Sequence, residues 1–540
     1  MIRISNVKFR PKAVPDDFKP YIEELTGFKN IVSLRVAKKS VDARKKENLC
    51  LLYVFDVFLD GDENAAAAEC PYKDIVVMNE PEPLPSPVWR AVSRPRPVVV
   101  GTGPAGLMAG LALAQAGANP ILLERGKPVS KRRKDVNRLW KIGELNENSN
   151  VQFGEGGAGT FSDGKLTTGI KKDAWTRKVL QEFVAAGAPA EILYLAKPHI
   201  GTDKLGYMVG NLRRKIMAAG GEYRFETRLT DLIVRDGRLI GVKTVNAQGE
   251  TEEIATDRVV LAVGHSARDT FEMLYERGVQ MIQKPFAVGA RIEHPQSYIN
   301  KSQYGMVKPR PVLGPADYKL AVHMDSGRSL YTFCMCPGGA VVAAASEAGR
   351  LVTNGMSTFA RDGENANSAL LVDVTPADFG SDHPLAGMEF QRQIEENAFR
   401  AGGGLFRAPV QRVVDFLHDR ETVKFGEVRP SYRPGVEMAD MRAVLPPYVI
   451  ETMKEGFKKM DRKIRCFSGH DAILTAAETR TSSPIRMLRS PETLQSVSVA
   501  GLYPCGEGAG YAGGIMSAAA DGLRCAYKIM ADESEPDTAE

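Results

Sequence analysis

The first 78 residues alternate apolar runs that are typical of strands with one run whose apolar positions recur at helical spacing. IRISNVKF (2–9) and LCLLYVFDVFL (49–59) predict strands, and DDFKPYIEELTG (16–27) predicts a helix that ends at Gly27. We therefore expect a small α+β domain over residues 1–78. The prolines in residues 79–96 predict an extended linker after it.

From residue 97 onward, short apolar runs alternate with glycine-rich turns and helical patterns, which is typical of βαβ units in a parallel sheet. Successive strands are expected over residues 222–264, with a hairpin turn at Asp236 and Gly237. The pattern predicts an α/β fold with a Rossmann-like nucleotide-binding domain in two parts, 97–285 and 441–540. A mixed α+β substrate or cap domain, 286–440, is inserted between them. The last ten residues are acidic and polar and predict a frayed tail.

Residues 97–123 carry no charged side chain and are long enough to span a bilayer. Five glycines and Pro104 interrupt them, however, so a strand, a tight turn and a buried helix are favoured.

The chain is 43% hydrophobic and 25% charged with a formal net charge of +5, which favours an ordinary globular protein over one that binds nucleic acid or membranes. Its seven cysteines include no CxxC pair, and no signal peptide is recognised, so we expect a cytoplasmic protein with free thiols and no metal site.

The segment RPVVVGTGPAGLMAGLALAQAGANPILLERG (96–126) contains every part of a dinucleotide-binding turn. Gly101 allows the sharp turn after a buried strand, Gly103 allows close approach of a pyrophosphate, and Gly106 allows the helix to pack on the strand. The free N–H groups at the start of that helix favour phosphate. Glu124 ends a second strand about twenty residues on, where a carboxylate accepts ribose hydroxyls and disfavours a 2′-phosphate. The site therefore suits FAD or NAD.

The segment GLYPCGEGAGYAGGIMSAAADG (501–522) distinguishes the two cofactors. An apolar strand leads to Gly506 and Glu507, then to a glycine-dense turn, and then to a helix from about Ile515. A second helix N-terminus suits the ribityl chain and pyrimidine carbonyls of a flavin, whereas NAD has no need of it. We therefore expect FAD, with Glu507 at the ribityl hydroxyls.

Four motifs in this order resemble those of a bacterial family of uncharacterised FAD-dependent dehydrogenases in the glutathione-reductase-like flavoprotein superfamily. They are VVVGTGPAGLMAGLALAQAG…ILLERG, NVQFGEGGAGTFSDGKLTTGI, VVLAVGHSARDTF and YPCGEGAGYAGGIMSAAADG. The resemblance implies an FAD-binding fold and a hydride-transferring flavoenzyme. Together with the residue analysis, it predicts cofactor contacts from Gly101, Gly103, Pro104, Ala105, Gly106, Glu124, Arg125, Gly156, Gly157, Gly159, Thr160, Gly264, Gly506, Glu507, Gly513, Gly514 and Ile515.

FGEGGAGTFSDGK (153–165) is a formal match to the same glycine pattern, through Gly154, Gly156 and Gly159. It follows a helical stretch that contains KRRK (131–134), and no buried strand leads into it, so it lacks the frame that binds pyrophosphate. We interpret it as a loop that crosses the flavin ring, with Asp163 and Lys165 at the substrate edge. KRRK itself is interpreted as an exposed helix start.

Residue type alone selects seven candidates for proton transfer or substrate binding: Asp163, Lys165, His265, Arg291, His323, Glu478 and Arg480. His265 follows a strand-end glycine, so two roles stay open for it, orientation of FAD and acid catalysis. Glu478 and Arg480 lie in AAETRTSSPIR (476–486), which is read either as an anion-binding edge or as a surface loop. Lys165, His265, Glu478 and Arg480 are the main candidates.

Cys334 and Cys336, in FCMCPGG, are one residue apart and would share one face of a strand. A reducible disulfide near the flavin is one hypothesis, and two buried structural thiols are the favoured one. Near the N-terminus, the basic cluster of Lys38, Lys39, Arg44, Lys45 and Lys46 is interpreted as a solvated helix face.

The sequence therefore predicts an FAD-dependent oxidoreductase that moves hydride between flavin N5 and an unidentified small organic substrate, with NAD(P)H or another carrier as electron partner. A flavin hydroxylase that uses oxygen is the first alternative. An RNA-associated flavoprotein, suggested by the basic cluster, and a flavin sensor without turnover are the others.

Overall fold

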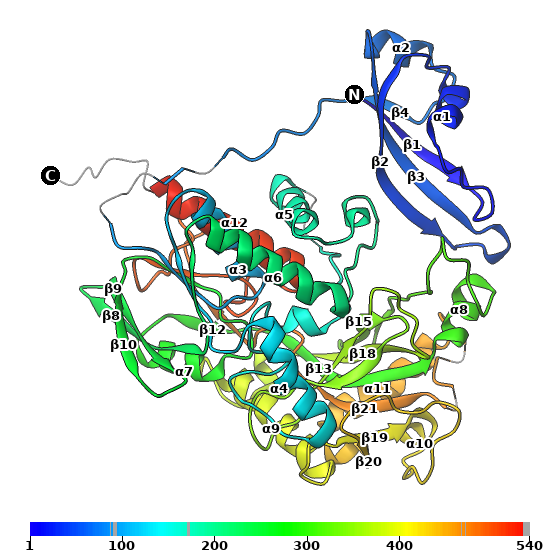
Figure 1. Cartoon of the computed structure of the whole chain (residues 1–540). Coiled ribbons are helices and arrows are strands. Elements are labelled where there is room, and N and C mark those ends of the chain that lie inside the picture. The colour runs from blue at the N-terminus through cyan, green and yellow to red at the C-terminus, as the bar shows by residue number, and fades with distance from the viewer. Residues whose placement is uncertain (87, 90–93, 170–172, 466, 470, 533–540) are drawn as a thin grey trace.

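The computed structural model describes residues 1–86, 88–89, 94–169, 173–465, 467–469 and 471–532. Parts of the predicted linker and most of the predicted acidic tail lie outside these residues. In the described part, the chain forms a small N-terminal domain and a larger body that contains two main sheets (Figure 1).

The N-terminal domain is a four-stranded antiparallel sheet with two helices, in the β-α-β-β-α-β order of ferredoxin-like domains. Figure 1 shows it in blue, standing apart from the body except at one end of β2 and β3. Its helix α1 ends at Gly27 in the left-handed conformation, as the sequence predicts. The strands, in sheet order, are β2 (Ile31–Asp42), β3 (Cys50–Leu59), β1 (Ile2–Phe9) and β4 (Ile75–Val77), and the helices are α1 (Lys19–Thr26) and α2 (Glu63–Glu69).

The interpretation of the basic cluster as a helix face is wrong. Lys38 and Lys39 lie on strand β2, and Arg44 follows the strand and pairs with Asp42. The backbone of Lys39 bonds to the body, since its N–H donates to the carbonyl of Tyr194 at 2.9 Å. This part of the cluster therefore belongs to a contact between the N-terminal domain and the body.

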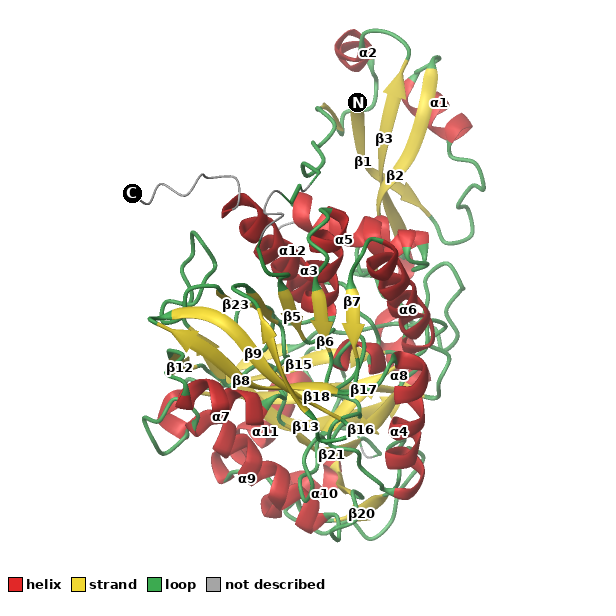
Figure 2. Cartoon of the chain, turned by 60° about the vertical axis from the view of Figure 1, so that its left-hand side comes forward, coloured by secondary structure: helices red, strands yellow, loops and turns green. Residues whose placement is uncertain are grey.

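The body contains a five-stranded parallel sheet between helices on one face and a three-stranded meander on the other (Figure 2). Alternate side chains explain the two layers: Val99 and Leu122 pack on the helices, whereas Val98, Val100 and Leu123 pack on the meander and α7. The sheet order is β23 (Leu502–Pro504), β11 (Val259–Leu261), β5 (Val98–Val100), β6 (Ile121–Leu123) and β7 (Glu222–Arg224). The helices are α3 (Pro104–Gln115), α5 (Ala174–Ala185), α6 (Thr202–Ala218), α7 (Arg268–Glu276) and α12 (Ile515–Asp532), and the meander is β8 (Thr227–Arg235), β9 (Arg238–Asn246) and β10 (Thr251–Ala255).

A mixed seven-stranded sheet forms the second half of the body. Its strand β21 follows residue 440, yet it pairs with β13 at the centre of this sheet; the domain division at 440 stays a prediction. The sheet order is β14 (Ala321–His323), β15 (Ser329–Cys336), β18 (Asn365–Val374), β13 (Phe286–Pro295), β21 (Ile473–Glu478), β19 (Ala408–Arg412) and β20 (Val436–Met438). Around it lie α8 (Gln296–Tyr304), α9 (Ala386–Ala401), α10 (Val413–Leu417) and α11 (Pro447–Met460).

The remaining elements connect these sheets. They are α4 (Val129–Ile142), the pair β16 (Ala340–Ala343) and β17 (Thr353–Met356), the pair β12 (Met281–Gln283) and β22 (Ile485–Met487), and 3-10 turns at Lys46–Asn48, Ala158–Phe161, Ala190–Leu193, Pro376–Asp378 and Met441–Ala443.

Two local predictions are confirmed by the backbone. The hairpin between β8 and β9 turns at Asp236 and Gly237, which both have positive φ, 50° and 72°. The uncharged stretch 97–123 is divided into β5, α3 and β6. Across the described residues, we find no helix that is both long enough and apolar enough to cross a membrane. The α/β fold class, with a Rossmann-like domain and additional α+β parts, is confirmed.

Candidate functional site

A cavity runs along the edge of the parallel sheet at which the strands end. It holds about 1480 Å³ of empty space, counting its opening to solvent. Residues at or just after the ends of β5, β6, β11 and β23 line it, so it spans four neighbouring strands. Ligands of open α/β sheets bind at this edge. Twelve of the residues predicted to contact a cofactor line the cavity: Gly101, Gly103, Pro104, Ala105, Glu124, Arg125, Gly157, Gly159, Gly264, Glu507, Gly514 and Ile515.

The first glycine turn has the geometry that its sequence predicts. Gly101 has φ 93°, and a Cβ there would lie 2.4 Å from the carbonyl oxygen of Ala262. A Cβ on Gly106 would lie 1.8 Å from the carbonyl oxygen of Gly101, so only glycine allows α3 to start this close to β5. Gly103 caps α3 without a side-chain hydrogen bond, which leaves the helix N-terminus open toward the cavity.

Glu124 holds this end of the cavity together. Its carboxylate accepts hydrogen bonds from the N–H and hydroxyl of Thr102 at 3.0 and 2.6 Å, and from the N–H groups of Gly126 and Gly154 at 2.9 and 3.0 Å. The side chain is nearly inaccessible, with 4% of the residue exposed. One carboxylate therefore joins β6 to both glycine-rich loops.

The interpretation of KRRK as an exposed helix start is wrong for Arg132, which is fully buried. Its guanidinium donates to five backbone carbonyls, those of residues 150, 151, 154, 155 and 157, at 2.7–3.2 Å. These bonds shape the second glycine loop. A Cβ on Gly157 would lie 3.0 Å from Cα of Gly103, so the two glycine loops contact each other. They border one cavity.

The other end of the cavity lies between β23 and α12. Glu507, Gly514 and Ile515 line it. Burial raises the pKa of Glu507 to about 7, although the backbone N–H of Gly514 and the charge of Lys284 act in the opposite direction. Both predicted helix N-termini, those of α3 and α12, thus face the same cavity.

Five of the predicted cofactor residues do not line the cavity: Gly106, Gly156, Thr160 and Gly506, which are buried behind its wall, and Gly513, which is exposed. Among them, Gly156 donates to the carbonyl of Thr102 at 2.8 Å, and Gly506 donates to Asp521 at 2.8 Å. These two bonds connect segments that line the cavity.

A polar wall of the cavity combines two strands of the seven-stranded sheet with neighbouring segments. Cys334 of β15 and Glu478 of β21 line it, together with Asn354 of β17 and with Lys165, which bonds to β15. Arg291 lies behind them, fully buried, and donates to the carboxylate of Glu478 at 3.0 Å and to the carbonyl of Cys334 at 2.8 Å. Burial raises the pKa of Glu478, and the charge of Arg291 limits that rise. One guanidinium thus fixes two cavity-lining residues.

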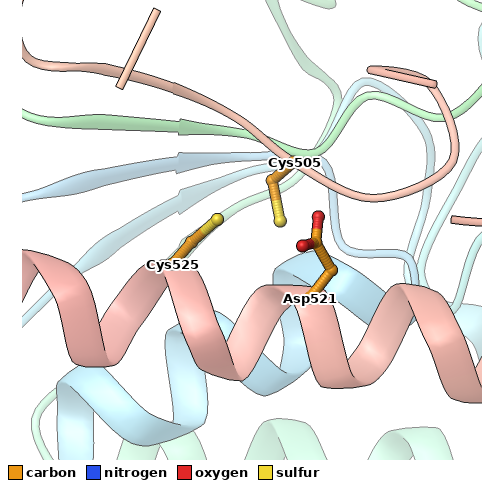
Figure 3. Close-up of side chains that lie close together, drawn as sticks. All are labelled: Cys505, Asp521 and Cys525. Carbon is orange, nitrogen blue, oxygen red and sulfur yellow. The ribbon is translucent and has the colours of Figure 1, made fainter. Parts of the chain in front are cut away.

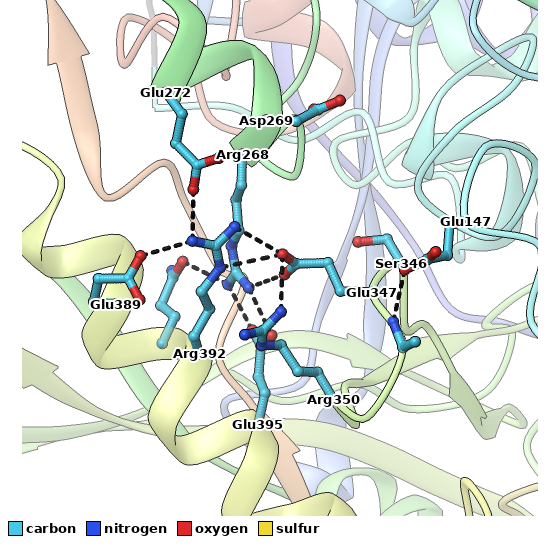
Figure 4. Close-up of polar contacts among 12 residues, drawn as sticks. Glu147, Arg268, Asp269, Glu272, Ser346, Glu347, Arg350, Glu389, Arg392 and Glu395 are labelled. Atoms are coloured by element: carbon cyan, nitrogen blue, oxygen red, sulfur yellow. Dashed lines mark hydrogen bonds and ion pairs between the residues drawn. The ribbon is translucent and has the colours of Figure 1, made fainter. Parts of the chain in front are cut away.

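A buried ion-pair network joins Arg268 of α7 and Glu395 of α9 to Glu347, in the segment before β17 (Figure 4). Arg480 belongs to this network through its ion pair with Glu395. Glu395 is fully buried and accepts two hydrogen bonds from Arg268 and two from Arg480, all at 2.8–3.0 Å. Burial alone would raise its pKa, but the two guanidinium groups hold the pKa of Glu395 well below the usual range. The reading of residues 476–486 as a surface loop is therefore wrong for Glu478 and Arg480.

The same network acts on His265, which lines the cavity. Burial, together with the charges of Arg480 and Arg268, lowers the pKa of His265 to about 3. The imidazole is therefore neutral at physiological pH. Its Nδ1 lies 3.1 Å from the hydroxyl of Ser266.

The candidate residues divide into two groups. Lys165, His265, Glu478 and Arg480 all line the cavity. His323 lies on exposed strand β14 and bonds to Ser329, so the structure does not bring it to the site. Asp163 is buried beside Arg361 and Ser357 behind the lining, where it bonds to both.

Two residues that the sequence analysis missed are central to the site. Thr102 lies inside the GTGPAG motif, and its hydroxyl bonds to Glu124. Arg132 lies on the buried face of α4 with Val129, Val136 and Leu139. That spacing of three, four and three residues is helical, and it was a signal that Arg132 points inward.

Comparisons with known proteins identify the group to which the chain belongs. Residues 285–481 match a family described as "FAD-dependent protein, C-terminal domain-like", residues 96–132 match an FAD binding domain, and residues 1–58 match a domain of unknown function. A protein of Clostridium beijerinckii, named only as uncharacterized, is 49% identical over 98% of both chains. The chain belongs to a family of FAD-dependent proteins.

Solved structures of flavoenzymes are also similar, at a greater distance. L-proline dehydrogenase from P. horikoshii is 10% identical, with 82% of this chain and 95% of that chain covered and a TM-score of 0.35. A 3-ketosteroid dehydrogenase from Rhodococcus jostii RHA1 is 13% identical, with 84% and 100% covered and a TM-score of 0.35.

The cavity of this FAD-dependent protein fits its cofactor at both ends. The open N-terminus of α3 beside Gly101 and Gly103 suits the pyrophosphate, and the N-terminus of α12 suits the far end of an extended dinucleotide. The expectation that FAD is the cofactor is confirmed.

Arg132→Lys tests how far the second glycine loop depends on the buried guanidinium. A lysine keeps the charge but has one donor group, so most of the five carbonyl bonds are lost. We expect the dissociation constant of FAD to rise about 10-fold, the equivalent of one charged hydrogen bond. Flavin fluorescence during titration of the apoprotein measures it. Arg133→Lys, on the exposed face of the same helix, is the control. Equal affinity in both variants would contradict the role of Arg132.

One further cluster joins α12 to the residue that follows β23 (Figure 3). The ligand atoms of Cys505, Asp521 and Cys525 lie within 4.8 Å of one another, and all three residues are buried. The guanidinium of Arg489, however, donates to both oxygens of Asp521 at 2.7 and 2.9 Å. A cationic partner thus already neutralises this carboxylate. The thiol of Cys505 is hydrogen-bonded to that of Cys525, which together with burial raises the pKa of Cys505 well above its ordinary value. The expectation of no metal site stays a prediction.

Proposed function

We propose that this protein is an FAD-dependent oxidoreductase that transfers hydride between flavin N5 and a small organic substrate. One observation carries the proposal: a single cavity is lined by the N-termini of two helices, which suit FAD, and by a polar wall that includes Lys165 and Glu478 and can face a substrate. Bound FAD supplies the two-electron chemistry. The residues of the chain position the substrate and handle the proton.

Lys165 is the proposed substrate anchor. Four cationic side chains are among the described residues that line the cavity. Arg125, Arg228 and Arg480 form ion pairs with carboxylates, whereas Lys165 forms none with the described residues. Its amino group donates to the carbonyl of Met335 and keeps further donors for an anionic group. We therefore propose a substrate that carries a carboxylate or a similar anion.

Glu478 is the proposed proton-handling group. Its raised pKa increases the share of the neutral acid, and Arg291 keeps the carboxyl group in a fixed orientation. His265 is neutral, and we propose that it orients the cofactor; of its two possible roles we therefore favour orientation.

Three expectations stay predictions: membership of the glutathione-reductase-like superfamily, a cytoplasmic location and the use of NAD(P)H.

The proposed role of Lys165 is tested by Lys165→Met. We expect the rate of flavin reduction or reoxidation by the substrate to fall about 100-fold, within the range for loss of a positioned polar group. Lys165→Arg, which keeps the charge, should recover part of that loss. The measurement is anaerobic stopped-flow absorbance of the flavin with a panel of small carboxylates. Unchanged rates in Lys165→Met at full flavin occupancy would rule out the anchor.

The reaction class is tested by anaerobic titration with NADH and NADPH, followed by mixing with oxygen. Reduction that is reversed by an organic acceptor supports the proposal. Rapid oxygen uptake that depends on an aromatic acid, with oxygen incorporated into it, would contradict the proposal and indicate a flavin hydroxylase.

A further inference from the structure

Cys334 and Cys336 lie at an irregular point in strand β15. The pairing of β15 with β18 is regular up to Phe333 and shifts register before Cys336. Cys334 has φ 44°, in the left-handed region that non-glycine residues rarely adopt. Bulges of this kind re-aim side chains beside active sites. Here Cys334 lines the cavity, whereas Cys336 is fully buried next to it.

The two thiols are neighbours at this irregular point. The thiol of Cys336 donates to the carbonyl oxygen of Cys334 at 3.2 Å, and it interacts with the thiol of Cys334. Arg291 donates to the same carbonyl, and Lys165 donates to the carbonyl of Met335 between the two cysteines. The whole Cys-Met-Cys turn is therefore held against the cavity by two cations.

This environment favours a thiolate at Cys334. The neighbouring thiol of Cys336 lowers the pKa of Cys334 to about 6, against the effect of burial. The charges of Arg291 and Lys165 lower it further, and Asp163 opposes them. Cys505 shows the contrast, because its pKa is raised. A thiolate beside a second thiol is the arrangement required for thiol–disulfide chemistry.

We propose that Cys334 and Cys336 form a second two-electron centre, which converts between a dithiol and a disulfide by exchange with the flavin. The inference rests on bound FAD and deepens the proposed function. In the reducing direction, the S–S bond breaks and reduced anionic flavin gives up two electrons and one proton. The products are oxidised FAD, a thiolate at Cys334 and a protonated thiol at Cys336, so no further reactant is needed. The reverse direction stores an electron pair on the flavin.

The two centres together should hold four electrons per flavin. Air-oxidised, FAD-loaded protein is titrated anaerobically with dithionite while the flavin absorbance is followed. We expect four electrons per flavin for the natural chain and for Cys50→Ser, a half-buried cysteine of the N-terminal domain. Cys334→Ser and Cys336→Ser should each take up two. Uptake of two electrons by the natural chain would overturn the inference.

A second measurement follows the sulfur atoms directly. Both cysteines lie in one tryptic peptide, residues 329–350, which contains no other cysteine. After air oxidation of the FAD-loaded protein, the peptide should be two hydrogens lighter and resist alkylation; after full reduction, it should take two alkyl groups. Two alkyl groups before reduction would overturn the dithiol centre while leaving the proposed oxidoreductase intact. Failure of the protein to bind FAD would instead remove the proposed function itself.

Discussion

Replacement of Glu124 by arginine is expected to yield protein without flavin. The carboxylate accepts four hydrogen bonds from Thr102, Gly126 and Gly154, and the residue is 4% exposed. Arginine would place an unpaired cation and a longer side chain among hydrogen-bond donors, at a cost of about 3–5 kcal/mol. The affinity for FAD should therefore fall more than about 100-fold.

Flavin absorbance per mole of purified protein, before and after incubation with added FAD, measures the loss. Glu276→Arg, an exposed carboxylate on α7, is the matched control and should stay yellow. Glu124→Gln keeps the size of the side chain and should weaken binding by a smaller factor, about 10-fold, because its amide group meets N–H donors. Full flavin occupancy in Glu124→Arg would contradict the assignment of this carboxylate to the cofactor site.

Replacement of Glu395 by leucine is expected to cause the largest loss of stability. Without this carboxylate, the buried guanidinium groups of Arg268 and Arg480 keep only part of their neutralising partners, chiefly Glu347. Breaking a buried ion pair by removing one partner costs about 3–5 kcal/mol. The midpoint of thermal unfolding should fall clearly, whereas Glu396→Leu, which removes a surface pair with Arg350, should change the free energy of unfolding by less than about 1 kcal/mol.

The difference in the free energy of unfolding between the natural chain and Glu395→Leu should depend on pH. The folded-state pKa of Glu395 is depressed, so its contribution is fully present above the unfolded value of about 4.3 and is lost as the pH falls below it. The difference in the free energy of unfolding should therefore be constant above pH about 5 and shrink steadily between pH about 4.3 and 3, without vanishing there, because the folded-state pKa lies lower still. Equal stability of the two proteins at neutral pH would show that the network contributes nothing.

The sequence predicted those parts of the site whose requirements are local. The turn around Gly101, Gly103 and Gly106 depends on residues that are neighbours in the chain, and Glu124 follows at the distance that one helix and one strand require. The hairpin at Asp236 and Gly237 is predictable for the same reason. Hence the fold class and the cofactor were both predicted correctly.

The parts that were missed depend on partners far away in the chain. Arg480 is neutralised by Glu395, 85 residues earlier, and no local pattern shows that pairing. In AAETR the charged residues suggested a loop, although all six residues of β21 are buried. The helical reading of the basic cluster failed because its lysines hid the alternation of Leu34 and Val36 along β2.

The cavity is walled by segments from opposite ends of the chain, since β5 and α3 provide one side and β23 with α12 provide the other. β23 is an edge strand that docks on β11, and α12 packs against α3. During synthesis, the pocket thus stays incomplete until α12 has left the ribosome. Flavin capture should consequently follow the synthesis of α12, and bound flavin should report that β23 and α12 have docked on the earlier part of the sheet.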